Sequence, residues 1–209
     1  MKIVRTDKEL HTPMIDAKIK EAGHQLVLLP DGITEDQLIE ETKDTDLILM
    51  CYTPITRRVI EAAKKLKGIV KYGVGIDAID IPAATAKGIP VVNIPEYAEQ
   101  TVAEGAFAML IALAKKLPAI QNQMESNGWA WPEPKWLGSD IAGKTLGIVG
   151  FGKIGKSIAR MANHGFRARV IAFSPHTDDH EMAKFGVTKY NSLSKLLSDS
   201  DFVSIHSVL

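Results

Sequence analysis

The sequence has one cysteine, no excess of charge and no long hydrophobic run, and each absence excludes a class of protein. With Cys51 alone, the 209-residue chain has neither an internal disulfide nor a cysteine cluster for zinc, which fits a reducing compartment. Lysine plus arginine and aspartate plus glutamate number 25 each, so no basic surface for nucleic acid is expected. No segment has the roughly 20 apolar residues of a membrane span, and the N-terminus lacks a signal-peptide pattern. We expect a cytoplasmic protein that has no metal site and binds neither nucleic acid nor membrane.

The first part of the chain alternates short apolar runs with amphipathic segments. Hydrophobic residues make up 45% and charged residues 24% of the sequence, as in ordinary soluble globular domains. Residues with helical spacing, such as Val59, Ile60 and Ala63, separate the apolar runs. The runs lie at 3–4, 25–29, 47–50, 68–72 and 91–92. This alternation predicts an α/β fold in which helices cover a parallel sheet.

A longer helix and an aromatic segment follow. Broad apolar patterning predicts one helix from Glu99 to Leu117, closed by Pro118. The segment 127–138 holds three tryptophans and two prolines, so it is predicted to be an irregular connection. No basic stripe accompanies the tryptophans, which favours packing or a subunit contact over stacking on bases.

From Thr145 the alternation of strands and helices starts again, which predicts a second α/β domain. The expected strands lie at 145–150, 169–173, near Val187 and at 201–205. The expected helices begin at Lys153 and Ser192. The chain stops at Leu209, directly after an apolar strand, and this ending predicts a domain that is incomplete at its C-terminus.

A glycine-rich turn joins the first strand and helix of this second domain. In the segment 150–155, Gly150 permits a tight turn, Gly152 lets the backbone approach a pyrophosphate, and Gly155 allows close packing of helix on strand. The helix that opens at Lys153 and Ile154 directs its unpaired amides and its positive dipole end at the phosphates. Because the turn lies between an apolar strand and an amphipathic helix, nucleotide binding is favoured over a purely structural turn.

The residue expected to select the nucleotide is unusual. An acidic side chain that holds the ribose hydroxyls should end the second strand, about 20 residues after the turn. The sequence instead has Ser174, followed by Pro175 and His176. Serine repels no 2′-phosphate and the histidine is able to help hold one, whereas no arginine lies at 174–177. The choice between NAD and NADP therefore stays open.

Four blocks of the sequence resemble the D-isomer-specific 2-hydroxyacid dehydrogenase family, which includes phosphoglycerate, glycerate and formate dehydrogenases. They are the segment 71–77 with Asp80 and Ala83-Ala84, and the segments 88–93, 102–104 and 143–155. The resemblance runs over nearly the whole chain. It implies a flavodoxin-like, parallel-sheet substrate domain over residues 1–98 and an NAD(P)-binding Rossmann domain over residues 99–209, the latter incomplete.

The resemblance also implies where ligands bind. A loop with free backbone amides holds the substrate carboxylate in the family, although its glycines also fit a simple tight exit from a strand. The corresponding residues are Tyr72, Gly73, Val74 and Gly75. Thr101 matches a position near the nicotinamide, although an N-terminal helix cap explains it equally well. His206 matches a motif at the end of the fourth strand, where ligands of open α/β sheets bind, and is expected near the cofactor but not as the proton-exchanging base.

Family members transfer a hydride between NAD(P) and a 2-hydroxy or 2-oxo acid, using an arginine for the carboxylate and a histidine, assisted by a glutamate, for the hydroxyl proton. These three catalytic residues are expected beyond Leu209. The chain is therefore predicted to lack the C-terminal third of the family's sequence and to be inactive alone. The intact protein is expected to form a homodimer. The alternative is an NAD(H)-sensing binding protein, like the corepressors that share this fold.

Overall fold

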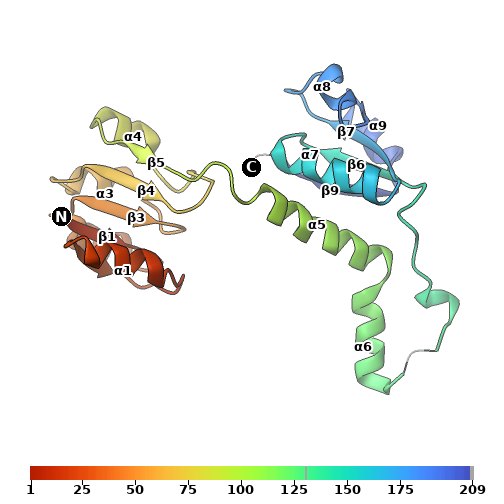
Figure 1. Cartoon of the computed structure of the whole chain (residues 1–209), viewed down its shortest axis with the longest axis horizontal. Helices are drawn as coiled ribbons and strands as arrows, with labels where there is room; N and C mark the ends of the chain where they lie inside the picture. Colours follow the sequence, from red (N-terminus) through yellow and green to blue (C-terminus); the bar gives the residue numbers. More distant parts are fainter. Residues whose placement is uncertain (130, 208–209) are drawn as a thin grey trace. The chain divides into compact units, whose positions relative to one another are not determined.

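The computed structural model describes residues 1–129 and 131–207. It divides into two compact units, Met1–Tyr97 and Ala98–Leu209, which are described separately below. Both units are built from a parallel sheet and helices (Figure 1), so the predicted α/β class is confirmed. Within the described residues, no helix is long and apolar enough to cross a membrane.

Unit 1 contains a five-stranded sheet in the order β2-β1-β3-β4-β5, and all its pairings are parallel. This is the flavodoxin-like order 2-1-3-4-5. The strands are β1 Lys2–Arg5, β2 Gln25–Leu28, β3 Leu47–Met50, β4 Gly68–Lys71 and β5 Val91–Val92. Because every strand runs the same way, the loops after β1, β3 and β4 meet at one edge of the sheet.

Four helices connect these strands. They are α1 Pro13–Glu21, α2 Glu35–Thr42, α3 Arg57–Ala62 and α4 Ile81–Ala86. The side chains of Thr34, Thr56 and Asp80 accept amide hydrogens at the starts of α2, α3 and α4, which satisfies otherwise unpaired donors. The core lies between these three helices and one face of the sheet, around Ile48 and Ile69, both fully buried.

Unit 2 contains a four-stranded parallel sheet in the order β8-β7-β6-β9. The strands are β6 Thr145–Val149, β7 Arg169–Phe173, β8 Val187–Lys189 and β9 Phe202–Ile205. The order corresponds to 3-2-1-4, the first four strands of a Rossmann sheet. In the described part of the chain, β9 pairs with β6 alone.

Helices cover both faces of this sheet. They are α7 Lys153–Arg160 with its continuation η2 Met161–Gly165, α8 Asp179–Ala183 and α9 Leu193–Ser198. Successive β6 residues point to opposite faces: Ile148 faces Gly155 of α7, whereas the Gly147 position faces Leu196 of α9. The unit's core joins α5, Glu99–Ala114, to α7 and the sheet, with Phe107 and Leu110 buried.

The sequence predicts a single helix from Glu99 to Leu117, and the predicted C-terminal end of that helix is wrong. The helix α5 stops at Ala114, Lys116 adopts a left-handed φ of 56°, and a second helix, α6, spans Leu117–Asn127. Proline lacks an N–H and fits the first turn of a helix, so Pro118 opens α6 instead of closing α5. Figure 1 shows α6 pointing away from the sheet of unit 2. The expected irregular segment follows, with one short turn, η1 Pro134–Trp136.

Candidate functional site

The glycine turn lies at the carboxyl end of β6. Gly150 has a φ of 93°, a left-handed conformation that side-chain-bearing residues rarely adopt. A Cβ on Gly150 would stand 2.5 Å from the carbonyl carbon of His206. The N–H of Gly150 donates to the carbonyl of Phe173 at 2.9 Å, and the N–H of His206 donates to Val149 at 2.7 Å. These contacts bring the ends of β6, β7 and β9 together around the turn.

The two other glycines of the turn have contrasting surroundings. A Cβ on Gly155 would stand 2.4 Å from the Gly150 carbonyl oxygen, so only glycine allows α7 to pack this closely on the turn. At Gly152, the N-cap of α7, no atom lies within 4 Å of the Cβ position and no side chain caps the helix. The backbone at Gly152 is therefore open to a ligand that replaces the missing cap. A phosphate suits this place, because its oxygens accept the first helix amides at the positive end of the dipole.

The two residues that open α7 differ in their surroundings. Lys153 is exposed, whereas Ile154 is partly buried and packs against the core of unit 2. Ile154 therefore anchors the first turn of α7 to the core through its side chain.

The loop after β7 contains the three residues expected at the ribose. Ser174 is buried, and its hydroxyl lies 3.1 Å from that of Thr177. Pro175 and His176 are exposed. Because Gly150 bonds to Phe173, the residue before Ser174, this loop is anchored beside the glycine turn.

His206 lies beside the glycine turn. The Nε2 atom of His206 lies 2.7 Å from the Ser204 hydroxyl, and burial lowers the pKa of the imidazole, so the neutral form is favoured. Its backbone packs on Gly150.

Thr101 is exposed in the first turn of α5. The N-cap of this helix is Ala98, so the explanation of Thr101 as a helix cap is wrong. Among the described residues, no hydrogen bond joins Thr101 to the turn.

In unit 1, the loop after β4 has free backbone donors. The carbonyl of Gly73 accepts the N–H of Ile94 at 3.0 Å, and the carbonyl of Val74 accepts from Asn93 Nδ2 at 2.7 Å. In contrast, the N–H groups of Gly73, Val74 and Gly75 donate to no backbone carbonyl in the described ranges. The loop is thus fixed through its carbonyls, whereas its amides have no backbone partner among the described residues, and the nearest carboxylate oxygen, Oδ2 of Asp77, lies 3.1 Å from the Cβ position of Gly75.

Tyr72, expected in the same loop, has its polar groups engaged inside the unit. Its N–H donates to Met50 at 3.1 Å, and its hydroxyl donates to the carbonyl of Thr6 at 2.9 Å. Burial raises the pKa of Tyr72 to about 12. The side chain therefore ties the loop to the end of β1.

Two residues that the sequence analysis did not single out organise this edge of the sheet. Asp7 is buried, with a left-handed φ of 56°. Its carboxylate accepts the N–H groups of Cys51, Tyr52 and Thr53 at 2.8, 3.1 and 3.1 Å. Burial alone raises the pKa of Asp7, but the hydrogen bonds from Thr6, Cys51, Thr53 and Tyr52 outweigh it and hold the pKa below its ordinary value. The other residue, Lys71, is buried at the end of β4.

Comparisons with known proteins agree with this geometry. Residues 107–209 match the family described as "D-isomer specific 2-hydroxyacid dehydrogenase, NAD binding domain". The chain is 35% identical to D-3-phosphoglycerate dehydrogenase of Methanocaldococcus jannaschii, over 99% of this chain and 38% of that protein. It is 41% identical to glyoxylate reductase of Korarchaeum cryptofilum, over 81% of this chain and 51% of that protein. The chain therefore spans about a third to a half of these relatives' length.

Two solved structures extend the comparison. D-lactate dehydrogenase from Aquifex aeolicus, complexed with NAD and lactic acid, has a TM-score of 0.81 and 26% identity, over 98% of this chain and 60% of that one. An acyclic imino acid reductase in complex with NADPH and D-Arg has a TM-score of 0.83 and 29% identity, over 99% of this chain and 65% of that one.

The four-stranded sheet and the glycine turn define unit 2 as a dinucleotide-binding domain of the Rossmann class. Together with the matches above, they show that the chain belongs to the D-isomer-specific 2-hydroxyacid dehydrogenase family. Residues 107–209 of this chain thus correspond to the NAD-binding domain of the family.

Proposed function

We propose that this chain forms the dinucleotide-binding and carboxylate-binding parts of a dehydrogenase that interconverts 2-hydroxy and 2-oxo acids. The observation that carries the proposal is the contrast within the glycine turn. Gly150 and Gly155 are closed in by backbone atoms, whereas the Cβ position of Gly152 is open where a pyrophosphate would approach. The open place lies at the N-terminus of α7, where no side chain caps the helix and a phosphate is able to accept the first helix amides.

The residues of unit 2 fit the cofactor as follows. The backbone at Gly152, Lys153 and Ile154 would hold the pyrophosphate. Ser174 and its loop would hold the adenosine ribose. His206 would lie beside the turn. When bound, the dinucleotide supplies the hydride acceptor or donor. Burial lowers the pKa of His206, so its imidazole adds no positive charge beside the proposed dinucleotide site.

We propose that unit 1 binds the carboxylate of the 2-hydroxy or 2-oxo acid. The unpaired amides at Gly73, Val74 and Gly75 are donors suited to carboxylate oxygens, because a carboxylate accepts several hydrogen bonds at once. Asn93 and Ile94 hold the loop from the other side. The amides are thus arranged before any substrate arrives, which lowers the ordering cost of binding.

The proposal is tested by titrating the 209-residue chain with NADH in a calorimeter. Saturable binding with one site per chain is expected, and heat no larger than that of dilution would contradict it. Full activity is then tested in the complete protein, with NADH and glyoxylate or pyruvate as substrates. The corepressor alternative has no observation in its favour, since the relatives named above are a dehydrogenase and a reductase.

We further propose that the cofactor site accepts NADPH as well as NADH. Ser174 carries no negative charge, so nothing at the end of β7 repels a 2′-phosphate, and the exposed His176 lies two residues further along. Dissociation constants for the two cofactors within about tenfold of each other are expected. A preference for NADH of a hundredfold or more would contradict dual use.

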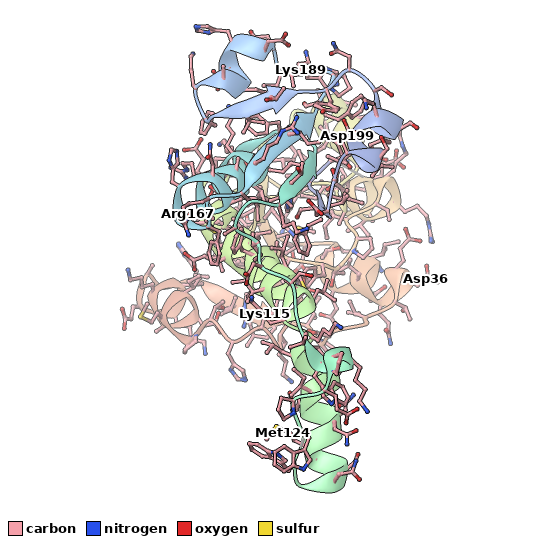
Figure 2. The ribbon with its side chains drawn as sticks, turned by 90° about the vertical axis from the view of Figure 1, so that its right-hand side faces the viewer. Asp36, Lys115, Met124, Arg167, Lys189 and Asp199 are labelled. Atoms are coloured by element: carbon pink, nitrogen blue, oxygen red, sulfur yellow. The ribbon has the colours of Figure 1, made fainter. Side chains whose placement is uncertain are left out.

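We propose that the intact protein forms a homodimer. The two copies would bind each other through an apolar arm formed by α5, α6 and the tryptophan segment. The exposed apolar residues of this arm are Met109, Leu113, Leu117, Met124, Trp129, Trp131 and Leu137. Figure 2 shows Met124 on α6, the helix that points away from the sheet in Figure 1. Exposed apolar side chains in this number are typical of contact sites. Sedimentation equilibrium of the intact protein is expected to give a dimer, and a monomer at micromolar concentration would contradict the proposal.

A cytoplasmic location is also proposed. The single cysteine, Cys51, is a buried free thiol, as is usual for proteins of a reducing compartment. Fractionation of the source cells is expected to place the protein with cytoplasmic markers, and recovery in a secreted fraction would contradict this location.

A further inference from the structure

The side chain of Lys71 is 7% exposed and lies beside the proposed carboxylate loop. A Cβ built on Gly73 would stand 2.8 Å from Cε and 3.5 Å from Nζ of this lysine. The ammonium therefore occupies the space next to Gly73 that a side chain there would otherwise take. A lysine side chain is seldom buried to this degree unless it is paired.

The partners of this ammonium are all neutral. Its Nζ atom donates to the carbonyl of Cys51 and lies 3.9 Å from the Cys51 sulfur. It also lies 5.3 Å from the centre of the Tyr52 ring, within range of a cation–π contact. No ion pair of the described residues includes Lys71.

The carboxylate of Asp7 does not compensate the charge of Lys71. Asp7 is turned to the same loop after β3, but its oxygens are occupied by the amides of Cys51, Tyr52 and Thr53 and by the hydroxyls of Thr6 and Thr53. Asp7 thus binds the amide side of the β3 loop, whereas Lys71 binds the carbonyl of Cys51. Asp7 and Lys71 therefore both hold the loop after β3, although they form no ion pair with each other.

We infer that Lys71 is a charge-bearing positioning residue: its buried ammonium favours an anion on the free amides of Gly73–Gly75 and ties the β3 loop to the β4 loop. The inference rests on the proposed carboxylate site. A cation with only neutral partners gains from a nearby anion, because the attraction in a partly buried place is several times that in water. The same lysine holds Cys51, so the charge and the loop geometry depend on one side chain.

The test is a titration of the ¹⁵N,¹³C-labelled 209-residue chain with pyruvate, followed by NMR. In the wild type, pyruvate is expected to shift the amide signals of Gly73 and Gly75 together with the ¹³Cε signal of Lys71. Pyruvamide, which is uncharged, is expected to shift none of them. The variant Lys71→Met is expected to bind pyruvate about tenfold more weakly, and Lys71→Arg to regain part of the loss.

Lys87→Met is the matched control. Lys87 also donates to backbone carbonyls, those of Ile60 and Glu61, but it lies outside the loop, so its removal is expected to leave pyruvate binding unchanged. Equal pyruvate affinity in wild type and Lys71→Met would overturn the inference and leave the carboxylate site standing. If pyruvate shifts neither glycine in the wild type, the site itself is wrong and the inference falls with it. Should Lys71→Met not fold, the wild-type ¹³Cε signal decides: no movement while Gly73 shifts overturns the role of Lys71.

Discussion

Adding one methyl group at different glycines of unit 2 is expected to separate cofactor binding from stability. In Gly155→Ala, the new methyl would stand 2.4 Å from a backbone oxygen of Gly150, which cannot move without displacing the turn. In Gly152→Ala, the methyl enters space where no protein atom lies within 4 Å. Gly105→Ala in α5 also meets no atom within 4 Å, but it lies away from the turn and is the control.

The structure sets the expected magnitudes. Overpacking of this kind costs about 1–3 kcal/mol, so Gly155→Ala should lower the melting temperature by roughly 5–15 °C. At Gly152 the φ of −77° suits any residue, so the free energy of unfolding should change by less than about 0.5 kcal/mol. The methyl would instead occupy the place of the pyrophosphate, and we expect at least a ~10-fold loss of NADH affinity. Gly105→Ala should stabilise the helix by about 0.5–1 kcal/mol without affecting NADH.

Calorimetric NADH titration and thermal unfolding of the three variants provide the assay. The reasoning predicts that affinity falls at Gly152 with stability retained, and that stability falls at Gly155. If Gly152→Ala binds NADH as tightly as the wild type while remaining folded, the open position is not the pyrophosphate site. If Gly152→Ala and Gly155→Ala lose stability equally, the distinction drawn between the two glycines is wrong.

Three further predictions concern the edge of unit 1 and the activity of the chain. Asp7→Asn should lower the free energy of unfolding by about 2–3 kcal/mol at neutral pH. The pKa of Asp7 is depressed in the folded state, so its stabilising contribution is present above the ordinary pKa of 3.8 and is lost as the pH falls through the folded-state pKa. In urea unfolding, acid should therefore lower the free energy of unfolding less in Asp7→Asn than in the wild type. Tyr72→Phe removes the bond to Thr6 and should cost about 1 kcal/mol in the same assay. The 209-residue chain is expected to give no dehydrogenase turnover with NADH and any 2-oxo acid, because the arginine, glutamate and histidine that the family uses for catalysis are not assigned to any of its described residues; saturable activity would refute this.

The strand positions and the glycine turn were predictable from the sequence because they depend on local signals. Apolar runs at regular intervals mark parallel strands, and the three glycines of the turn each meet a requirement that depends on nearby backbone. The contact between Gly150 and His206 joins residues far apart in the sequence, yet the positions of both residues follow from strand order.

Other features depend on contacts that a single sequence does not reveal. The break between α5 and α6 depends on the left-handed Lys116, whereas Pro118 by itself fits either the end of one helix or the start of the next. Asp7 and Lys71 were missed because their partners lie on another strand's loop, 44 and 20 residues away. The signal that singles out Asp7 is an acidic residue two positions after the end of β1, at the carboxyl end of a parallel strand.

The central claim is that a nicotinamide dinucleotide binds at the glycine turn of unit 2. The most direct measurement is an amide NMR map of the ¹⁵N-labelled chain with increasing NADH. The claim predicts that the largest shifts fall at Gly150, Gly152 and Ser174 and saturate together, and that in Gly152→Ala the shifts of Gly150 and Ser174 need at least ~10-fold more NADH. Saturable shifts confined to other surfaces, or none at millimolar NADH, would contradict it.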